Sequence, residues 1–449
     1  MSRISNAAPF TATRSTFEVM STSPAVNAVA KPQVATTMHA RFDAAYWSRL
    51  EDLAGRPAAQ ATDVVFLREH EPAWDDRISL IQNSRSAIWG SLYIVNADDR
   101  AFALFEALID ARRRGIDVCV AIDSIAHLGT SFGDKRADRK KLDGLIETLR
   151  AEGGVVTWAG TLDDQLRKPG AGVHFKSLVS DNRVAIVGGR NISEEYFGDW
   201  TDFDTRLEGP IVQQIGRATL DLLRSTDATP VPFQRDARLD GQADRVQDRI
   251  EALLSKPPPH GGAAPNRPPV EFQLLTFDPL VDGADGSQNV ITEALKETID
   301  RAQKEIVLTS NFVTPAFDLR ESLIAAAERG VRVKLVTSGP EAVSPLAHKA
   351  VALTYADLLA AGCEIWETSD HEHGKMYVVD GQVGAYGSYN ASIISDARNA
   401  EGLLFTSDKR VVSELRHAVE DTLSRSERYT GAPNRFAAWV LDLAGRIFN

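Results

Sequence analysis

Two stretches of the chain carry the same set of chemically active residue types in the same order. Each has a histidine, a lysine two residues later, an aspartate, a glycine, an asparagine and then an acidic residue. The corresponding residues are His174/His373, Lys176/Lys375, Asp181/Asp380, Gly188/Gly387, Asn191/Asn390 and Asp202/Glu401. The two members of every pair are 199 residues apart (373 minus 174 for the histidines), so the chain contains an internal repeat.

The repeated residue types suit the cleavage of a phosphodiester. Lysine and asparagine supply positive charge and hydrogen-bond donors for phosphate oxygens, whose charge grows as phosphorus becomes five-coordinate. Imidazole acts as a nucleophile or a proton carrier near neutral pH. One copy is half a site, whereas two copies together supply one histidine to attack and another to protonate the leaving oxygen. We therefore expect His174, Lys176, Asn191 and their counterparts His373, Lys375 and Asn390 to meet in one catalytic site.

The acidic residues of each repeat have two expected roles. Asp202 and Glu401 fit the role of a carboxylate that accepts a hydrogen bond from the far ring nitrogen of a histidine and fixes its tautomer. Asp181 and Asp380 fall at turn signals, some distance along the strand from the histidines. We expect them to hold the turn or to bridge to a neighbouring cation, outside direct contact with substrate.

Each repeat is predicted to be a β-hairpin, because apolar runs flank the turn signals at 181–182 and 380–381. Alternation along a strand places the histidine and lysine of one repeat on the same face. If the first hairpin folds about residues 181–183, the asparagine returns beside the histidine. The residues before each asparagine, Gly189 and Ser388, leave room for a ligand close to the backbone.

The pattern HxKxxxxDx6G(G/S)xN, present twice, resembles the phospholipase D superfamily. The sequences GGRNISEEYF, LEGPIV and SNFVTP are similar to the bacterial cardiolipin synthase branch. This resemblance implies a covalent phosphohistidine intermediate, no metal or other cofactor, and a phosphatidyl group passed from a phospholipid to water or an alcohol. It also implies His174 as nucleophile and His373 as acid, although the symmetric repeats alone do not order them.

Strands and helices are expected to alternate before each hairpin, as in the strands at 63–67 and 116–123 with a helix ending at Gly115. This predicts an α/β fold of two similar α-β-α sandwich domains, with mostly parallel sheets, pseudo-twofold related, and an active site at their interface. The expected division of the chain is a disordered leader at 1–40, a first domain at 41–235, a linker at 236–269 and a second domain at 270–449.

Composition limits the partners. The net charge of −12 opposes binding of a long polyanion, so no nucleic acid is expected, and we expect a phospholipid substrate with transient contact to a membrane surface. The two cysteines lack metal-site spacing. No apolar run is long enough for a transmembrane helix and no signal peptide is recognised. These features predict a soluble protein, cytoplasmic or exported by a signal-independent route, that is peripheral at membranes. Because both half-sites are in one chain, a monomer is expected.

Two other functions remain open from the sequence. The same centre could serve a nuclease or another non-lipid phosphodiesterase, and a degenerate member of the superfamily could be an inactive binding module. The sequence does not choose between hydrolysis and transfer, nor does it name the head group. A helical pattern at 434–449 fits either packing on the protein or insertion at a bilayer surface. His371 is set aside because only His373 has the lysine and aspartate at the repeat spacing.

Overall fold

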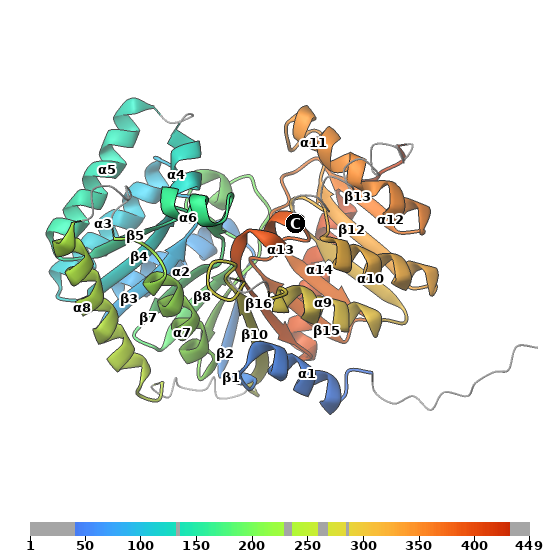
Figure 1. The fold of residues 1–449 in the computed structure, drawn as a ribbon, viewed down its shortest axis with the longest axis horizontal. Coiled ribbons are helices and arrows are strands. Elements are labelled where there is room, and N and C mark those ends of the chain that lie inside the picture. Colours follow the sequence, from blue (N-terminus) through green and yellow to red (C-terminus); the bar gives the residue numbers. More distant parts are fainter. Residues whose placement is uncertain (1–40, 132–134, 229–235, 259–267, 284–286, 432–449) are drawn as a thin grey trace, which may run out of the picture. The chain divides into compact units, whose positions relative to one another are not determined.

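The computed structural model describes residues 41–131, 135–228, 236–258, 268–283 and 287–431. The segment expected to be a disordered leader, 1–40, and the C-terminal pattern at 434–449 lie outside the described residues. The described residues form two β-sheets with helices on both faces of each sheet, as Figure 1 shows. No helix in the described ranges is long and apolar enough to cross a membrane.

The first sheet contains seven strands. Their spatial order is β2 (Asp63–Leu67), β9 (Asp204–Glu208), β8 (Val184–Gly188), β7 (Lys176–Ser180), β3 (Ala87–Leu92), β4 (Asp117–Asp123) and β5 (Val155–Ala159). The first histidine hairpin, β7 and β8, therefore lies in the middle of its sheet. Its register pairs Lys176 with Gly188 and Ser180 with Val184, as the predicted turn requires.

The second sheet repeats this plan with additional edge strands. Its order is β1 (Ala59–Ala61), β10 (Val270–Phe277), β16 (Asn399–Thr406), β15 (Val383–Gly387), β14 (Met376–Val379), β11 (Glu305–Thr309), β12 (Arg332–Ser338), β13 (Glu364–Thr368) and β17 (Ser426–Arg428), and β6 (Gly172–Val173) also pairs with β16. The second hairpin, β14 and β15, is again central. The predicted α/β architecture with two similar halves is confirmed.

The prediction of mostly parallel sheets is wrong. Parallel pairing joins β3, β4 and β5 in one sheet and β11, β12 and β13 in the other. Apart from the short β6–β16 pair, the remaining neighbours are antiparallel. The sequence pattern of alternating strands and helices applies only to the parallel part, because a helix must carry the chain back between parallel strands, whereas each hairpin adds antiparallel strands.

Helices cover both sheets. In the first half they are α2 (His70–Gln82), α3 (Asp99–Arg113), α4 (Ser124–Ser131), α5 (Arg136–Ala151), α6 (Leu162–Arg167), α7 (Ile211–Arg224) and α8 (Ala237–Leu254). In the second they are α9 (Val290–Asp300), α10 (Phe317–Glu328), α11 (Pro345–Ala352), α12 (Ala356–Ala360), α13 (Ile393–Ala397) and α14 (Lys409–Ser424). One apolar core contains side chains of α7, α8 and α14 together with both sheets, so the two halves share a core.

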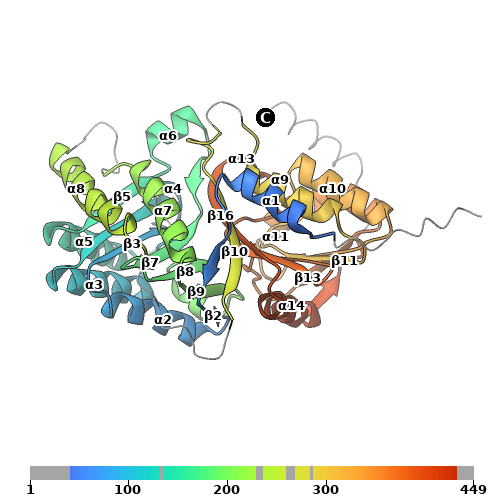
Figure 2. The same cartoon turned by 90° about the horizontal axis from the view of Figure 1, so that it is seen from below.

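Two segments lie in places that the sequence did not predict. The N-terminal helix α1 (Ala44–Ala54) falls within the residues expected to form the first domain, but it packs on β10 and α9 of the second half, as Figure 2 shows. The segment 236–269 was expected to be a linker, yet its first part forms α8, which packs on α7, β4 and β5. Both helices bury apolar side chains, among them Tyr46 and Ile250, which explains why they fold onto the body of the protein.

The aspartates at the hairpin turns bind the backbone at the point where a neighbouring strand begins. The Asp181 carboxylate accepts hydrogen bonds from three successive backbone N–H groups at 85–87, at distances of 2.8, 2.8 and 3.0 Å. Asp380 accepts from the N–H groups at 303–305 in the same way. Both aspartates have positive φ, 57° and 54°, as a tight hairpin turn demands. The two aspartates therefore hold the turn, which was one of their two expected roles. The contacts described here are to backbone N–H groups, whereas the other expected role was a bridge to a neighbouring cation.

Candidate active site

The two halves exchange hydrogen bonds at the histidines. The backbone N–H of His174 donates to the carbonyl of Ala400 in the other half, at 2.9 Å. The N–H of His373 donates to the carbonyl of Thr201, at 2.8 Å. Thr201 and Ala400 are themselves 199 residues apart (400 minus 201), so the contact obeys the repeat. Each histidine segment is thus held by the chain that leads to the acidic residue of the opposite half.

The histidine and carboxylate side chains are paired across the halves as well. His174 Nδ1 lies 2.9 and 3.0 Å from the two oxygens of Glu401. His373 Nδ1 lies 2.7 Å from Asp202 Oδ2. All four side chains are buried. In each pair the carboxylate accepts from Nδ1, so Nε2 is the nitrogen left for chemistry.

The two lysines lie beside their histidines. Lys176 Nζ donates to the carbonyl of His174 at 2.9 Å. Lys375 Nζ donates to the carbonyl of His373 and lies 3.0 Å from Nδ1 of the same ring. Since that Nδ1 already donates to Asp202, the second ammonium adds positive charge next to the ring without a further hydrogen bond. Both lysine side chains are at least nine-tenths buried.

Each asparagine stands three residues after the second strand of its hairpin. Asn191 Oδ1 accepts from the backbone N–H of Ile94 at 3.2 Å, and its buried Nδ2, next to the Tyr196 hydroxyl, makes no hydrogen bond of normal geometry. Asn390 Oδ1 accepts from Ser310 Oγ at 3.1 Å. In both cases the amide oxygen is fixed by the protein, which orients the amide NH₂ group as a donor.

The residues before the asparagines contact the carboxylates. A side chain at Gly189 would place its Cβ 2.1 Å from Asp202 Oδ1, so this position has room only for glycine. At the corresponding position, Ser388 Oγ donates to Glu401 Oε2 at 2.5 Å. The glycine was predicted to make room for a ligand, but here it makes room for the carboxylate that holds His373.

Several polar residues of the site were not predicted from the sequence. Asp204 is buried and pairs with Arg77 and Arg190, each at 2.9 Å. Ser395 Oγ donates to Glu401 at 2.6 Å, and Tyr93 packs edge-on against His174, with ring centroids 4.7 Å apart. The other members of this group are Asn399, Tyr196, Trp200, His371 and Glu372. Asp204 stands two residues after Asp202 in the acid-rich run DWTDFDTRLE. This closeness was the only sequence signal that Asp204 belongs to the site.

Comparisons with known proteins identify the family of the chain. Residues 78–217 and 295–422 match the family described as "Cardiolipin synthase, PLD-like domain", and together they make up more than half of the chain. The chain belongs to this phospholipase D-like family. Both histidine hairpins fall inside the matched residues.

Individual relatives of this phospholipase D-like chain are distant. It is 26% identical over 354 residues to cardiolipin synthase A of Pectobacterium carotovorum subsp. carotovorum (strain PC1), covering 77% of this chain and 66% of that protein. It is 26% identical over 332 residues to cardiolipin synthase B of Escherichia coli (strain K12), covering 71% and 70%. The alignment with cardiolipin synthase A thus spans just under two thirds of that relative.

A solved structure shares the fold of the phospholipase D-like chain. The crystal structure of phosphatidylserine synthase from Haemophilus influenzae Rd KW20 aligns with a TM-score of 0.62 at 14% sequence identity. The alignment covers 90% of this chain and 98% of that one. The architecture of two similar domains in one chain is therefore shared over nearly the whole length.

Burial sets the charge state of the site in this phospholipase D-like chain. Burial, reinforced by the two lysines, lowers the pKa of His174 to about 4, although Glu401 opposes the shift. Burial and the charge of Lys375 lower the pKa of His373 well below its ordinary value, and Lys176 and the ring of His174 act in the same direction. Burial alone would raise the pKa of Glu401, but His174 and Lys176 outweigh it and lower that pKa. Both rings are neutral at pH 7 when the site holds no anion.

The lysines are shifted in the same direction. Burial and the charge of Lys375 lower the pKa of Lys176 to about 7. Burial lowers the pKa of Lys375 to about 8, against the opposing charges of Asp202 and Glu401. Two desolvated ammonium groups next to each other favour loss of a proton, and a bound phosphate anion would reverse this.

We therefore expect the affinity for a phosphodiester anion to fall as pH rises. Binding raises the pKa values of the two lysines above about 7 and about 8, so the complex takes up protons at neutral pH and binding is weakened at higher pH. Each proton taken up contributes up to about tenfold in affinity per pH unit. The inhibition constant of dimethyl phosphate, which stays a monoanion, measured from about pH 6 to about pH 9 checks this. Lys375→Met should weaken binding and flatten the profile, and a flat profile in the unsubstituted protein would contradict the prediction.

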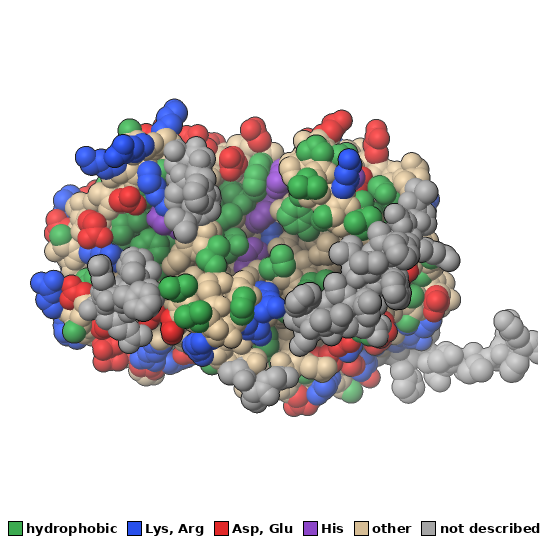
Figure 3. Space-filling model, turned by 45° about the horizontal axis from the view of Figure 1, so that its top comes forward, with side chains coloured by type: hydrophobic (Ala, Val, Ile, Leu, Met, Phe, Trp, Pro, Cys, Tyr) green, Lys and Arg blue, Asp and Glu red, His purple; other side chains and the backbone are tan. Residues whose placement is uncertain are grey.

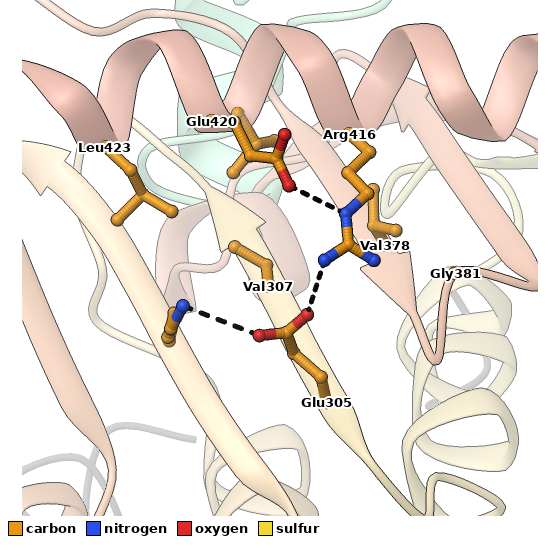
Figure 4. A pocket seen from close by; sticks show the side chains of 9 residues that line it. Glu305, Val307, Val378, Gly381, Arg416, Glu420 and Leu423 are labelled. Atoms are coloured by element: carbon orange, nitrogen blue, oxygen red, sulfur yellow. Dashed lines mark hydrogen bonds and ion pairs between the residues drawn. The ribbon is translucent and has the colours of Figure 1, made fainter.

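Other clusters in the described part of the chain are weaker candidates. A hollow of about 30 Å³ lies at the turn end of the second hairpin and is lined by Glu305, Arg416 and Glu420. Its charges pair with one another, Arg416 with Glu305 at 3.3 Å and with Glu420 at 2.7 Å, as Figure 4 shows. This network ties β11 to α14. Among the described residues no group of three or more histidine, cysteine or acidic side chains is arranged to hold a metal ion.

Proposed function

We propose that the protein cleaves phosphodiester bonds of phospholipids through a covalent phosphohistidine and passes the phosphatidyl group to water or to an alcohol. The observation that carries the proposal is the crossed pairing of two buried histidines with two buried carboxylates, Asp202 and Glu401. Both rings keep Nε2 for the substrate, and two ammonium groups lie beside them.

In the first step, His174 Nε2 attacks phosphorus and a phosphorus–nitrogen bond forms. The bond from phosphorus to the leaving alcohol oxygen breaks, and that oxygen takes the proton carried by His373 Nε2. Asp202 and Glu401 stabilise the positive charge that each ring bears during its part of the reaction. Burial keeps His373 neutral in the empty site. The negative charge of the bound substrate raises the pKa of the ring, which then takes up from solvent the proton that it donates to the leaving oxygen.

In the second step His373 acts as a base and His174 is the leaving group. His373 Nε2 accepts a proton from water or from an acceptor alcohol, whose oxygen attacks phosphorus. The phosphorus–nitrogen bond to His174 breaks and the free imidazole returns. An alcohol acceptor gives a new phosphatidyl ester, whereas water gives phosphatidic acid. Access of water to the cleft decides between the two outcomes.

The cations and amides supply transition-state stabilisation. As phosphorus becomes five-coordinate, negative charge grows on its non-bridging oxygens, and buried donors are worth more there than in water. Lys176 and Lys375 are held by backbone carbonyls next to the rings, and Asn191 and Asn390 are held by their amide oxygens. We assign these four side chains to the phosphate. Gly189 and Ser388 act through the carboxylates that they contact.

The choice of phospholipid rests on the family and its relatives. The matching family and the curated relatives carry the name cardiolipin synthase, and the acidic net charge of −12 does not favour a polyanionic substrate. Both half-sites are in one chain, so a monomer suffices for activity. The division of the chain into two domains remains a prediction, with α8 now counted with the first half.

Incubation with vesicles of mixed phospholipids and a primary alcohol tests the proposal. We expect mass spectrometry to detect a phosphatidyl-alcohol, phosphatidic acid or cardiolipin, each of which contains a phosphatidyl group that has left its original head group. The matched control is the double variant His174→Ala/His373→Ala, which should form none of them. Absence of all three products with the unsubstituted protein, together with cleavage of a nucleic-acid diester, would refute the lipid assignment.

A further inference from the structure

Exposed apolar side chains of the described residues gather at one end of the sheets. Eight large hydrophobic side chains are exposed there, and all eight lie in segments that follow the carboxyl ends of β4, β5, β10, β11, β12 and β15. The most exposed are Leu346 at 81%, Leu166 at 75%, Ile394 at 62% and Val281 at 57%. An isolated exposed leucine needs no explanation, but such a one-sided distribution does.

These strand ends are the ones that build the catalytic site. β4 ends at Asp123, whose carboxylate accepts from the backbone N–H of Val173, next to His174. β10 ends at Phe277, which pairs with Glu401. β12 ends at Ser338, whose hydroxyl donates to the carbonyl of the residue before His373. Figure 3 shows histidine side chains in a hollow with hydrophobic side chains on both sides.

Some of these exposed apolar side chains lie where the first half meets the second. We call Leu162, Leu166, Val281, Ile393 and Ile394 the rim patch; they come from α6, from the segment after β10 and from α13. The segments of the first and second halves lie against each other here, because an Arg167 guanidinium nitrogen donates to the Leu280 carbonyl at 3.3 Å.

Three cations accompany the rim patch. Arg167 and Lys168 end α6, and burial together with the nearby charge of Arg398 lowers the pKa of Lys168, which places two cations close to each other. Asp278 and Asp396 are near the same lysine. The local charge is therefore mixed, so we expect burial of the apolar side chains to contribute more to binding than electrostatic attraction does.

We propose that the rim patch docks on the surface of a phospholipid bilayer, with its apolar side chains in the interface and Arg167, Lys168 and Arg398 among anionic head groups. The inference rests on the proposed function, because it takes a bilayer lipid as the substrate. The position of the patch favours this occupant. Anything that covers the mouth of the site must also deliver the substrate, which a bilayer does and a second copy of the chain does not.

Flotation with vesicles of phosphatidylglycerol and phosphatidylcholine in equal parts tests the docking surface. The variant Leu166→Ser/Ile394→Ser should lose about tenfold or more of its vesicle partitioning, because two large apolar side chains no longer leave water. It should still turn over a short-chain phospholipid kept below its micelle concentration. His174→Ala should behave in the opposite way, binding vesicles normally without turnover.

A labelled cysteine gives a second measurement that needs no loss of function. Leu166→Cys carrying a polarity-sensitive fluorophore should shift its emission to the blue when vesicles are added. The natural cysteines, Cys119 and Cys363, are buried and will not take the label under native conditions. The matched control is Arg238→Cys on α8, whose Gln242 hydrogen bonds to Gly154 at the start of β5, the end of the sheet away from the site. No shift is expected there.

The outcomes separate the two proposals. Unchanged vesicle partitioning of Leu166→Ser/Ile394→Ser, or equal emission shifts at residues 166 and 238, would overturn the docking surface. Binding through the rim patch by a protein that forms no phosphatidyl product from any vesicle would uphold the docking surface and refute the proposed function. Turnover of soluble short-chain lipid without vesicle binding would uphold the function and overturn the docking surface.

Discussion

Replacement of His373 by asparagine is expected to trap the phosphoryl group on His174. The nitrophenolate group of a nitrophenyl phosphodiester can leave without being protonated by an acid. The first step should therefore proceed in His373→Asn with such a substrate. The second step needs a base to activate water, and its loss should slow turnover by about 10² to 10⁴-fold. We therefore expect a burst of nitrophenol close to one equivalent, followed by a slow steady state.

The trapped species distinguishes the two rings. Mass spectrometry of peptides from acid-free digests should locate the adduct on His174, and His174→Ala should show neither burst nor adduct. Phosphate on His373 in the His174→Asn variant would instead reverse the order of nucleophile and acid. Rapid turnover by both single variants would rule out a covalent histidine mechanism.

Neutralising one carboxylate is expected to disable the histidine of the opposite half. Asp202→Asn should resemble His373→Asn, with burst and slow release, because Asp202 holds His373 Nδ1 at 2.7 Å. Glu401→Gln should instead slow formation of the adduct, because Glu401 holds His174. An amide in place of the carboxylate disfavours the required tautomer and no longer stabilises the imidazolium, and a loss of about 10² to 10⁴-fold in turnover is expected.

A double-mutant comparison tests the crossed pairing directly. Asp202→Asn combined with His373→Asn should be little worse than His373→Asn alone, since both act through one ring. Glu401→Gln with His373→Asn should be worse than either single variant. Because Glu401 also binds Ser388 and Ser395, thermal unfolding of each variant must be measured alongside. Equal coupling within both combinations would contradict the pairing.

Much of the site was predictable because it depends on local rules. The hairpin register follows from a turn signal and the two-residue period of a strand, and the repeat shows which residues recur. The helix end at Gly115 was visible because a glycine readily adopts the left-handed conformation that closes a helix, and its φ is 88°. The crossed pairing was not predictable. A repeat shows that Asp202 and Glu401 are equivalent, but it does not say whether each serves its own histidine or the other one.

Other misses have tertiary causes. The sequence of α1 predicts a helix but carries no information on which sheet its apolar face will meet. The residues of α8 fall in the stretch 236–269 that was predicted to be a linker. The pairing of Asp204 with two arginines joins α2, β9 and the segment after β8, and such distant partners leave no spacing to recognise. The share of antiparallel strand pairs was underestimated because the sheets were expected to be mainly parallel, with each hairpin as a minor addition.

The crossed pairs have a consequence for the history of such a chain. After two copies of one ancestral unit are joined, a spare copy is normally free to decay. Here the acid of each copy completes the histidine of the other, so damage to either copy leaves two incomplete pairs of groups and not one intact set. Joining the copies therefore gave no redundancy, and the equivalent positions Gly189 and Ser388 support the two corresponding carboxylates by different means.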